Sequence, residues 1–161
     1  MFPFQVDGEN YTMQIWDTAG QERFKSLRTP FYRGADICML TFAVDDRKSF
    51  ENLAMWRKEF LYYADIQEGS PFPFLVLGNK CDVPSRDVAE DAARAWCGRN
   101  GDTPYFETSA KDSTNVDSAF KSAVSRLKEM EEQMEAKAPC HNSNSVDLSK
   151  KRGDAKGGCC S

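Results

Sequence analysis

Histidine is nearly absent from this chain of 161 residues, and the single one, His141, lies near the C-terminus. The six cysteines include no Cys-x-x-Cys pair, which together with the lack of histidine argues against a zinc site. The longest apolar runs are far too short to span a bilayer, and the N-terminus lacks the basic start and apolar run of a signal peptide. We therefore expect a cytosolic protein whose thiols stay reduced.

The formal net charge is −4, and this acidic balance argues against nucleic-acid binding. The charge is unevenly distributed. Residues 138–161 hold four Lys or Arg against two Asp, a net of +2, so residues 1–137 carry −6. Residues 138–161 are also rich in Ser, Asn, Gly and Lys, which is typical of disorder. We expect one domain over residues 1–137, followed by a disordered tail over residues 138–161.

Four segments have the patterning of strands. Residues 11–16 (YTMQIW) alternate in polarity after the turn sequence DGEN, as in a hairpin strand with one covered face. Residues 37–44 and 72–79 are continuously apolar, which is typical of strands buried on both faces of a parallel sheet. Residues 104–109 are a shorter strand candidate.

The segments between these predicted strands have the apolar periodicity of helices. Apolar residues recur at helical spacing over residues 50–66 and 116–130, and a shorter helix is expected around residues 92–97. The expected helix starts are marked by Ser49, by Asp87 with Glu90, and by Asn115. Alternating strands and helices predict a three-layer α/β fold, with helices on both faces of a mostly parallel sheet.

Three loops fall at the carboxyl ends of predicted strands, where a parallel sheet forms its ligand crevice. The first reads DTAGQ and begins at Asp17, whose carboxylate can hold Mg²⁺. Ala19 and Gly20 are small enough to let the backbone approach a terminal phosphate, and Gln21 can orient an attacking water. A turn with a capping Asp and a surface Gln explains this motif equally well when it stands alone.

The second loop reads GNKCD. A carboxylate at Asp82 can accept from the ring N–H and the exocyclic amine of guanine, a donor pattern that adenine does not present. Lys80 can lay its methylene stem along the base and ribose, and Asn79 can tie neighbouring loops together. The alternative is a polar loop with solvated charges.

The third loop reads ETSAK. Ala110 allows a backbone N–H to meet the guanine carbonyl oxygen, Ser109 would brace the neighbouring loop, and Lys111 can shield the second face of the base. Such triplets are common by chance, so the third loop is a weak signal by itself. The three loops in this order, each after a strand, together indicate a guanine-nucleotide site.

The motifs WDTAGQERF, FYRGAD, GNKCD and ETSAK resemble those of the Rab family of Ras-superfamily small GTPases, over almost all of residues 5–137. The segments SLRTPFYRGAD, VDDRKSFENL and KEFLYYAD look most like the Rab-nine branch, with the Rab-seven branch next. The resemblance implies the P-loop small-GTPase fold, with GTP or GDP and Mg²⁺ as ligands. It also implies a GTP-hydrolysing switch that regulates vesicle traffic, in particular from late endosomes to the trans-Golgi network.

The resemblance assigns roles to individual residues. Asp17 would bind Mg²⁺, Gly20 would sense the terminal phosphate, and Gln21 would position the attacking water. The implied nucleotide-binding residues are Asp17, Thr18, Ala19, Gly20, Asn79, Lys80, Asp82, Ser109, Ala110 and Lys111. Residues 19–33 correspond to the second switch. Trp16 and Tyr32 match two members of the aromatic triad that Rab effectors contact, with core packing as the alternative.

The chain ends GGCCS, and Cys159 and Cys160 resemble the paired cysteines on which Rab proteins receive two geranylgeranyl groups. Two lipid chains anchor stably where one is marginal, and the upstream KKRGDAK adds attraction to anionic headgroups. The alternative is an unmodified, frayed tail. The resemblance implies a monomer on the cytoplasmic face of late endosomal and Golgi membranes, with a cytosolic pool. Its implied partners are effectors, an exchange factor, an activating protein, the prenylation machinery and a GDP-dissociation inhibitor.

The phosphate-binding loop of that family, GxxxxGK[ST], has no counterpart in this sequence, and neither has the first switch. We therefore expect an N-terminally truncated small-GTPase domain, in which the strand that would separate residues 11–16 from residues 37–44 is missing. Two interpretations remain open. The sequence is part of a longer, working Rab GTPase, or the chain as it stands is a non-catalytic fragment with little or no nucleotide binding that acts at most as an interaction protein.

Overall fold

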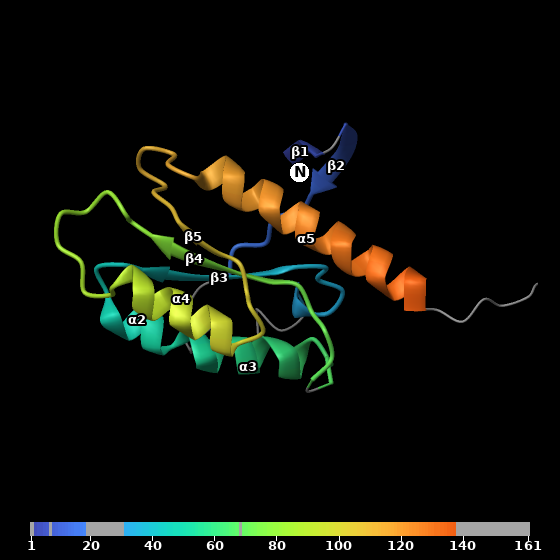
Figure 1. Cartoon of the computed structure of the whole chain (residues 1–161), viewed down its shortest axis with the longest axis horizontal. Coiled ribbons are helices and arrows are strands. Elements are labelled where there is room, and N and C mark those ends of the chain that lie inside the picture. The colour runs from blue at the N-terminus through green and yellow to red at the C-terminus, as the bar shows by residue number, and fades with distance from the viewer. Residues whose placement is uncertain (1, 7, 19–30, 68, 138–161) are drawn as a thin grey trace, which may run out of the picture.

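The protein contains a parallel sheet and a separate antiparallel hairpin (Figure 1). The computed structural model describes residues 2–6, 8–18, 31–67 and 69–137. The parallel sheet has the order β3-β4-β5, with β3 at Cys38–Ala43, β4 at Phe74–Asn79 and β5 at Tyr105–Glu107. The hairpin pairs β1 (Phe2–Val6) with β2 (Glu9–Met13).

Helices cover both faces of the parallel sheet, as the sequence predicts. Helices α2 (Arg47–Glu51), α3 (Leu53–Tyr63) and α4 (Glu90–Arg99) lie on one face, and α5 (Val116–Lys137) crosses the other (Figure 1). The predicted three-layer α/β fold is therefore confirmed. Helices on both sides are what parallel strands require, because each crossover connection carries a helix back over one face.

Apolar side chains form the core in two layers. The larger one lies between the sheet and helices α3 and α4, and Leu53 and Val76 within it are fully buried. The smaller one lies between the sheet and α5, where Leu75 packs on Ala119 and Ala123. Strand β4 therefore sends side chains into both layers, which explains why its sequence is continuously apolar.

Strand β3 is less completely covered than the sequence predicts. Leu40 and Phe42 are buried against the helices, but Thr41 on the opposite face is exposed. The expectation of burial on both faces is therefore confirmed for β4 and wrong at Thr41. The reason is positional, because the described part of α5 packs on Leu75 of β4 and leaves this part of β3 open.

The predicted hairpin is present, but its second strand is shorter than expected. β2 ends at Met13, which pairs with Phe2, so the residues after Met13 have no ladder partner in β1. Ile15 and Trp16, placed in a strand by their alternation, are about half exposed, at 48% and 54%. The hairpin is held near α5 by an ion pair between Glu9 and Lys128, at 3.1 Å.

Two of the three predicted helix starts are wrong. Helix α2 begins at Arg47, and the carboxylate of Asp46 accepts from the Ser49 N–H at 3.1 Å, so Asp46 is the N-cap in place of Ser49. The Ser49 hydroxyl instead accepts from the Ala43 N–H at the end of β3. Asp and Ser are both favoured N-cap residues. Because the helix starts three residues earlier than predicted, Asp46 and not Ser49 occupies the N-cap position.

Helix α4 starts at Glu90 without a side-chain cap, so the expected capping box of Asp87 and Glu90 does not form. The N–H groups of Asp87 and Val88 donate instead to the Val44 carbonyl, at 2.9 and 3.1 Å. The loop before α4 is thus tied to the end of β3, and this contact takes Asp87 out of capping position.

Helix α5 begins at Val116, as predicted, but continues beyond Met130 to Lys137. Its apolar stripe includes the buried side chains of Ala119, Ala123 and Val124. Although α5 is 22 residues long, none of the helices in the described part of the chain is both long and apolar enough to cross a bilayer.

Gly78 in β4 and Gly98 in α4 should respond in opposite ways to alanine. A Cβ on Gly78 would lie 2.5 Å from Tyr105 Oη and 3.1 Å from Phe42 Cζ, so Gly78→Ala should lower the free energy of unfolding by about 1–3 kcal/mol. A Cβ on Gly98 meets only Asp102 Oδ1, at 3.8 Å, which is an ordinary contact. Because alanine favours a helix more than glycine does, Gly98→Ala should raise the free energy of unfolding by about 1 kcal/mol. Urea unfolding of both variants tests this, and equal effects would contradict the packing at Gly78.

Candidate functional site

The loops that follow β4 and β5 meet at one edge of the parallel sheet. Because Gly78 pairs with Glu107, residues 79–82 and 108–111 leave the sheet side by side. Two backbone hydrogen bonds join them, from the Thr108 N–H to the Gly78 carbonyl at 2.9 Å and from the Cys81 N–H to the Thr108 carbonyl at 3.0 Å. Parallel register therefore brings two of the three predicted loops into contact, as expected for the carboxyl ends of neighbouring strands.

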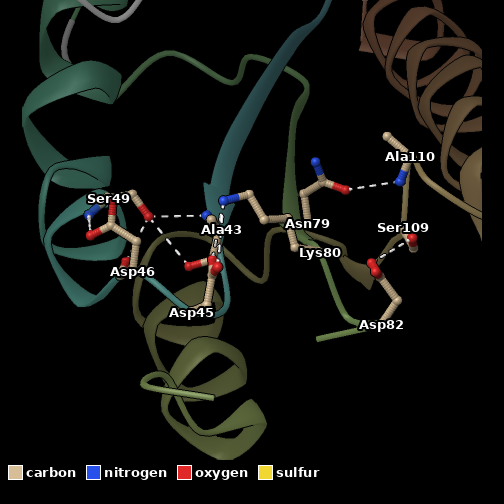
Figure 2. Close-up of polar contacts among 9 residues, drawn as sticks. All are labelled: Ala43, Asp45, Asp46, Ser49, Asn79, Lys80, Asp82, Ser109 and Ala110. Carbon is tan, nitrogen blue, oxygen red and sulfur yellow. Dashed lines mark hydrogen bonds and ion pairs between the residues drawn. The ribbon is translucent and has the colours of Figure 1, made fainter. Parts of the chain in front are cut away.

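Asn79 connects these two loops through its side chain. Its Oδ1 accepts from the Ala110 N–H at 3.2 Å (Figure 2). The same oxygen accepts from the Thr108 hydroxyl at 3.4 Å. The backbone N–H expected to meet a guanine carbonyl is thus donated to Asn79 in this structure. A carbonyl oxygen arriving there would have to share this donor or replace Asn79 as its acceptor.

Asp82 is the carboxylate at the centre of the site. Its Oδ1 accepts from the Ser109 hydroxyl at 2.7 Å (Figure 2), and its Oδ2 lies 3.7 Å from Lys111 Nζ. The Asp82 side chain is 16% exposed, whereas Lys111 is 83% exposed. The hydrogen bond from Ser109 lowers the pKa of Asp82, so the carboxylate is ionised at neutral pH.

Ser109 is fully buried and serves as the brace between the loops. Its hydroxyl donates to Asp82 and accepts from the backbone N–H groups of Lys111 and Asp112, at 3.2 and 3.4 Å. A buried hydroxyl needs such partners, because leaving it unpaired costs about 1–3 kcal/mol. The SAK sequence therefore turns around the Ser109 side chain and presents Lys111 beside Asp82.

Lys80 lies on the opposite side of β4 from Asp82. The backbone φ of Lys80 is 63°, a value that residues other than glycine rarely adopt. The Lys80 ammonium lies 3.4 Å from Asp45 Oδ1. Asp45 follows β3, so Lys80 links the ends of β3 and β4 (Figure 2). Asp45 was not among the predicted site residues. Its place just after a predicted parallel strand was the available signal.

Of the first predicted loop, the structure describes only Asp17 and Thr18, so Ala19, Gly20 and Gln21 lie outside the described residues. Asp17 is exposed and Thr18 is half-buried. Nowhere in the described ranges do three or more His, Cys, Asp or Glu side chains gather in a way that would hold a metal ion. One exposed carboxylate does not make a Mg²⁺ site, so the assignment of Mg²⁺ to Asp17 stays a prediction.

The two aromatic residues expected to meet effectors have different surroundings. Trp16 is exposed and stacks on Phe31, with ring centroids 4.5 Å apart, and Phe31 is itself 42% exposed. Tyr32 is half-buried and packs on Phe60 of α3 at 5.3 Å, so it contributes to the core. Phe31 lies within residues 19–33, the expected second switch, but was not singled out as an effector residue. Its signal was the aromatic pair FY beside the segment that carries Trp16.

The cysteines of the described part are free thiols. Burial raises the pKa of Cys38 to about 12 and that of Cys97 to about 11. Burial also raises the pKa of Cys81 in the GNKCD loop, and nearby carboxylates led by Asp112 add to this shift. All three therefore stay protonated near neutral pH, as expected for structural thiols. Cys159 and Cys160 lie outside the described residues.

Comparison with known proteins accounts for this arrangement of loops. The sequence model of the Ras family matches residues 2–129. Ras-related protein Rab-9B of Pongo abelii is 61% identical over 144 residues, which cover 89% of this chain and 70% of that protein.

Two further Ras-related proteins are similar to this chain over most of its length. Ras-related protein Rab-9A of Mus musculus is 63% identical over 131 residues, or 81% of this chain and 65% of that protein. Ras-related protein Rab7 of Cenchrus ciliaris is 48% identical over 160 residues, or 97% of this chain and 76% of that protein. The chain thus spans about two thirds of the length of the curated relatives that it matches. It belongs to the Ras family and, within that family, to the Rab-9 branch, with Rab7 next in similarity.

Proposed function

We propose that this chain binds guanine nucleotides and acts as a Rab-type switch in vesicle traffic. The observation that carries the proposal is the Asp82 carboxylate, which Ser109 holds in place at the carboxyl edge of the parallel sheet. Membership of the Ras family supports it, since that family generally binds GTP and GDP with Mg²⁺. Because the chain spans only part of its relatives, the activity of the whole protein is part of the proposal.

Base recognition follows from the acceptor capacity of Asp82. An ionised carboxylate offers about four lone-pair positions, and Ser109 uses one of them. The remainder can accept two neighbouring N–H groups, which guanine presents on its ring nitrogen and exocyclic amine. Adenine has no ring N–H at that position, so it would leave a largely covered carboxylate unpaired. Lys111 lies beside Asp82 and is mostly exposed, which supports its proposed role of covering one face of the base.

The remaining nucleotide roles rest on the family pattern. We assign Thr18, Ala19 and Gly20 to the terminal phosphate and Gln21 to the orientation of the attacking water, and we place Lys80 along the base and ribose. The Lys80 contact with Asp45 supports this placement, because it fixes the lysine stem at the end of β4. If the chain does not hydrolyse GTP, the alternative is a non-catalytic Rab protein that acts through its binding surfaces.

The cellular role that we propose is transport from late endosomes to the trans-Golgi network. Its support is the identity with Rab-9A and Rab-9B, at about three residues in five. Trp16 and Tyr32 would contact effectors, and Cys159 and Cys160 would carry geranylgeranyl groups that hold the protein on the cytoplasmic face of the membrane. The exposed stack of Trp16 on Phe31 supports an effector surface, because exposed aromatic pairs are typical of protein contacts.

Asp82→Asn should reverse the base preference of the chain. Asparagine can still accept the ring N–H, but its amide donates where a carboxylate accepts, so it suits the C2 carbonyl of xanthine better than the amine of guanine. We expect the affinity for GDP to fall by roughly ten-fold or more relative to that for xanthosine diphosphate. Competition binding measures the ratio. Asp91→Asn is the matched control, because Asp91 is an exposed carboxylate in the first turn of α4, outside the site loops. An unchanged ratio in Asp82→Asn would contradict the proposed contact.

Gln21→Leu should slow GTP hydrolysis by roughly ten-fold or more and leave GTP binding unchanged, because leucine cannot orient a water. Single-turnover hydrolysis and equilibrium binding measure the two effects, with Gln67→Leu in an exposed loop as the control. Equal hydrolysis by Gln21→Leu and the unsubstituted chain would remove the assigned role. Loss of both nucleotide binding and hydrolysis in the unsubstituted chain would favour the non-catalytic alternative.

Replacing both Cys159 and Cys160 with serine should release the protein from membranes. One lipid chain gives only marginal, reversible binding and two give stable anchoring, so each single variant should distribute between membrane and cytosol. Fractionation of eukaryotic cells and intact mass measure the anchoring and the lipid count. Cys140→Ser is the control in the same tail. Stable membrane binding by the double variant would show that the anchor lies elsewhere.

A further inference from the structure

Glu107, at the end of β5, receives two hydrogen bonds on a single carboxylate oxygen. Arg86 Nη2 donates to its Oε1 at 2.6 Å, and Tyr105 Oη donates to the same atom at 2.9 Å. The backbone carbonyl of Glu107 accepts from Asn115 Nδ2 at 2.8 Å. Glu107 therefore joins β5, the loop before α4 and the start of α5.

These partners come from both sides of the site. Arg86 lies four residues after Asp82 in the loop that leads from β4 to α4, and Glu107 lies two residues before Ser109. The same loop is fixed to the end of β3 by the Asp87 N–H, which donates to the Val44 carbonyl at 2.9 Å. Asp82 thus sits on a short span of chain whose far end is held by Glu107.

The Tyr105 hydroxyl connects this cluster to β4. It lies where a side chain on residue 78 would begin, so the glycine at the start of GNKCD lets the ring reach Glu107. Burial raises the pKa of Tyr105, and the hydrogen bond to Glu107 raises it further, so the hydroxyl stays protonated and acts as a donor. Glu107 also raises the pKa of Arg86 through their hydrogen bond, which marks a favourable ion pair.

We propose that Glu107 is a positioning residue for base recognition: by holding Arg86 and Tyr105 on one oxygen, it fixes the loop of Asp82 against the loop of Ser109. The inference rests on the proposed function, since the base that these loops would grip is guanine. Glu107 touches no base itself and acts through the placement of Asp82. The ion pairs that form within a single helix differ in kind. Arg126 and Glu129, for example, lie within one helix and connect no loops.

Partial burial makes this contact stronger than a surface ion pair. The side chains of Glu107 and Arg86 are 20% and 34% exposed, whereas that of Glu129 is 59% exposed. Exposed ion pairs contribute little, because water and salt screen them. A charge-assisted hydrogen bond is roughly twice as strong as a neutral one. Loss of the Glu107 charge should therefore loosen the two loops.

Hydrogen exchange of the full 161-residue chain without nucleotide tests the positioning directly. The reporters are the amides of Cys81 and Thr108, which bridge the two loops, and the amide of Val76 reports on opening of the whole sheet. Glu107→Gln should speed exchange at the two loop amides by roughly ten-fold relative to that of Val76, the factor expected for one lost charge-assisted hydrogen bond.

Arg86→Gln should have the same effect, and the double variant should be no faster than either single one, because both changes break one contact. Glu129→Gln is the matched control and should change neither loop amide. Unchanged exchange of Cys81 and Thr108 in Glu107→Gln and in Arg86→Gln would overturn the inference. A rise that Val76 follows equally would also overturn it, because the ion pair would then be a general stabiliser.

Binding to GDP and to inosine diphosphate tests the consequence for recognition. The inosine base lacks the exocyclic amine, so the ratio of the two affinities reports how well Asp82 meets that amine. The ratio should fall in Glu107→Gln and in Arg86→Gln by roughly the same ten-fold factor and stay unchanged in Glu129→Gln. Faster exchange with an unchanged ratio would overturn the role in recognition. If the unsubstituted chain shows no preference for GDP, the proposed function fails, and the exchange rates alone decide whether Glu107 positions the loops.

Discussion

The parallel pairing of β4 with β5 is the constraint on which the rest of the site depends. Its register sets Gly78 opposite Glu107, so the chain that leaves β4 at Asn79 and the chain that leaves β5 at Thr108 emerge together. Every contact between the two loops follows from that placement, including the hydrogen bonds from the Ala110 N–H to Asn79 and from the Ser109 hydroxyl to Asp82. A shift of one residue would turn these side chains to the other face of the sheet and separate them.

The core and the site are connected through the same strands. Tyr105 is at the edge of the larger core layer, stacked parallel to Phe42 at 6.3 Å, and its hydroxyl ends at Glu107 beside the loops. Gly78 makes room for that ring in the strand where GNKCD begins. The glycine of this motif therefore has a packing role as well as its place in the loop, and core packing helps to set the geometry of the polar edge.

Helices and strands with a strong apolar pattern were predicted correctly. Helix caps, which depend on which nearby group forms the hydrogen bond, were not. β4 and α5 were recognisable from an unbroken apolar run and a helical stripe, because burial against two layers or one groove imposes these patterns directly. The cap at Ser49 was wrong because Asp46 offers an equivalent acceptor one turn earlier, and the capping box at Asp87 was wrong because Val44 binds its backbone. The strand at Ile15 and Trp16 has the right alternation but no ladder partner, and alternation by itself cannot supply one.

The sequence by itself determined the α/β fold, the membership of the Rab-9 branch and the identity of the loop residues, because these depend on residue types and their spacing. Tertiary structure alone decided what those residues contact. The Ala110 N–H binds Asn79, Lys80 turns to Asp45, and Glu107 gathers Arg86 and Tyr105 on one oxygen. Apart from Tyr105, which lies two residues from Glu107 on the same strand, these partners are distant in sequence and carry no shared pattern. Only the register of the parallel strands and the packing of the helices could bring them within hydrogen-bonding distance.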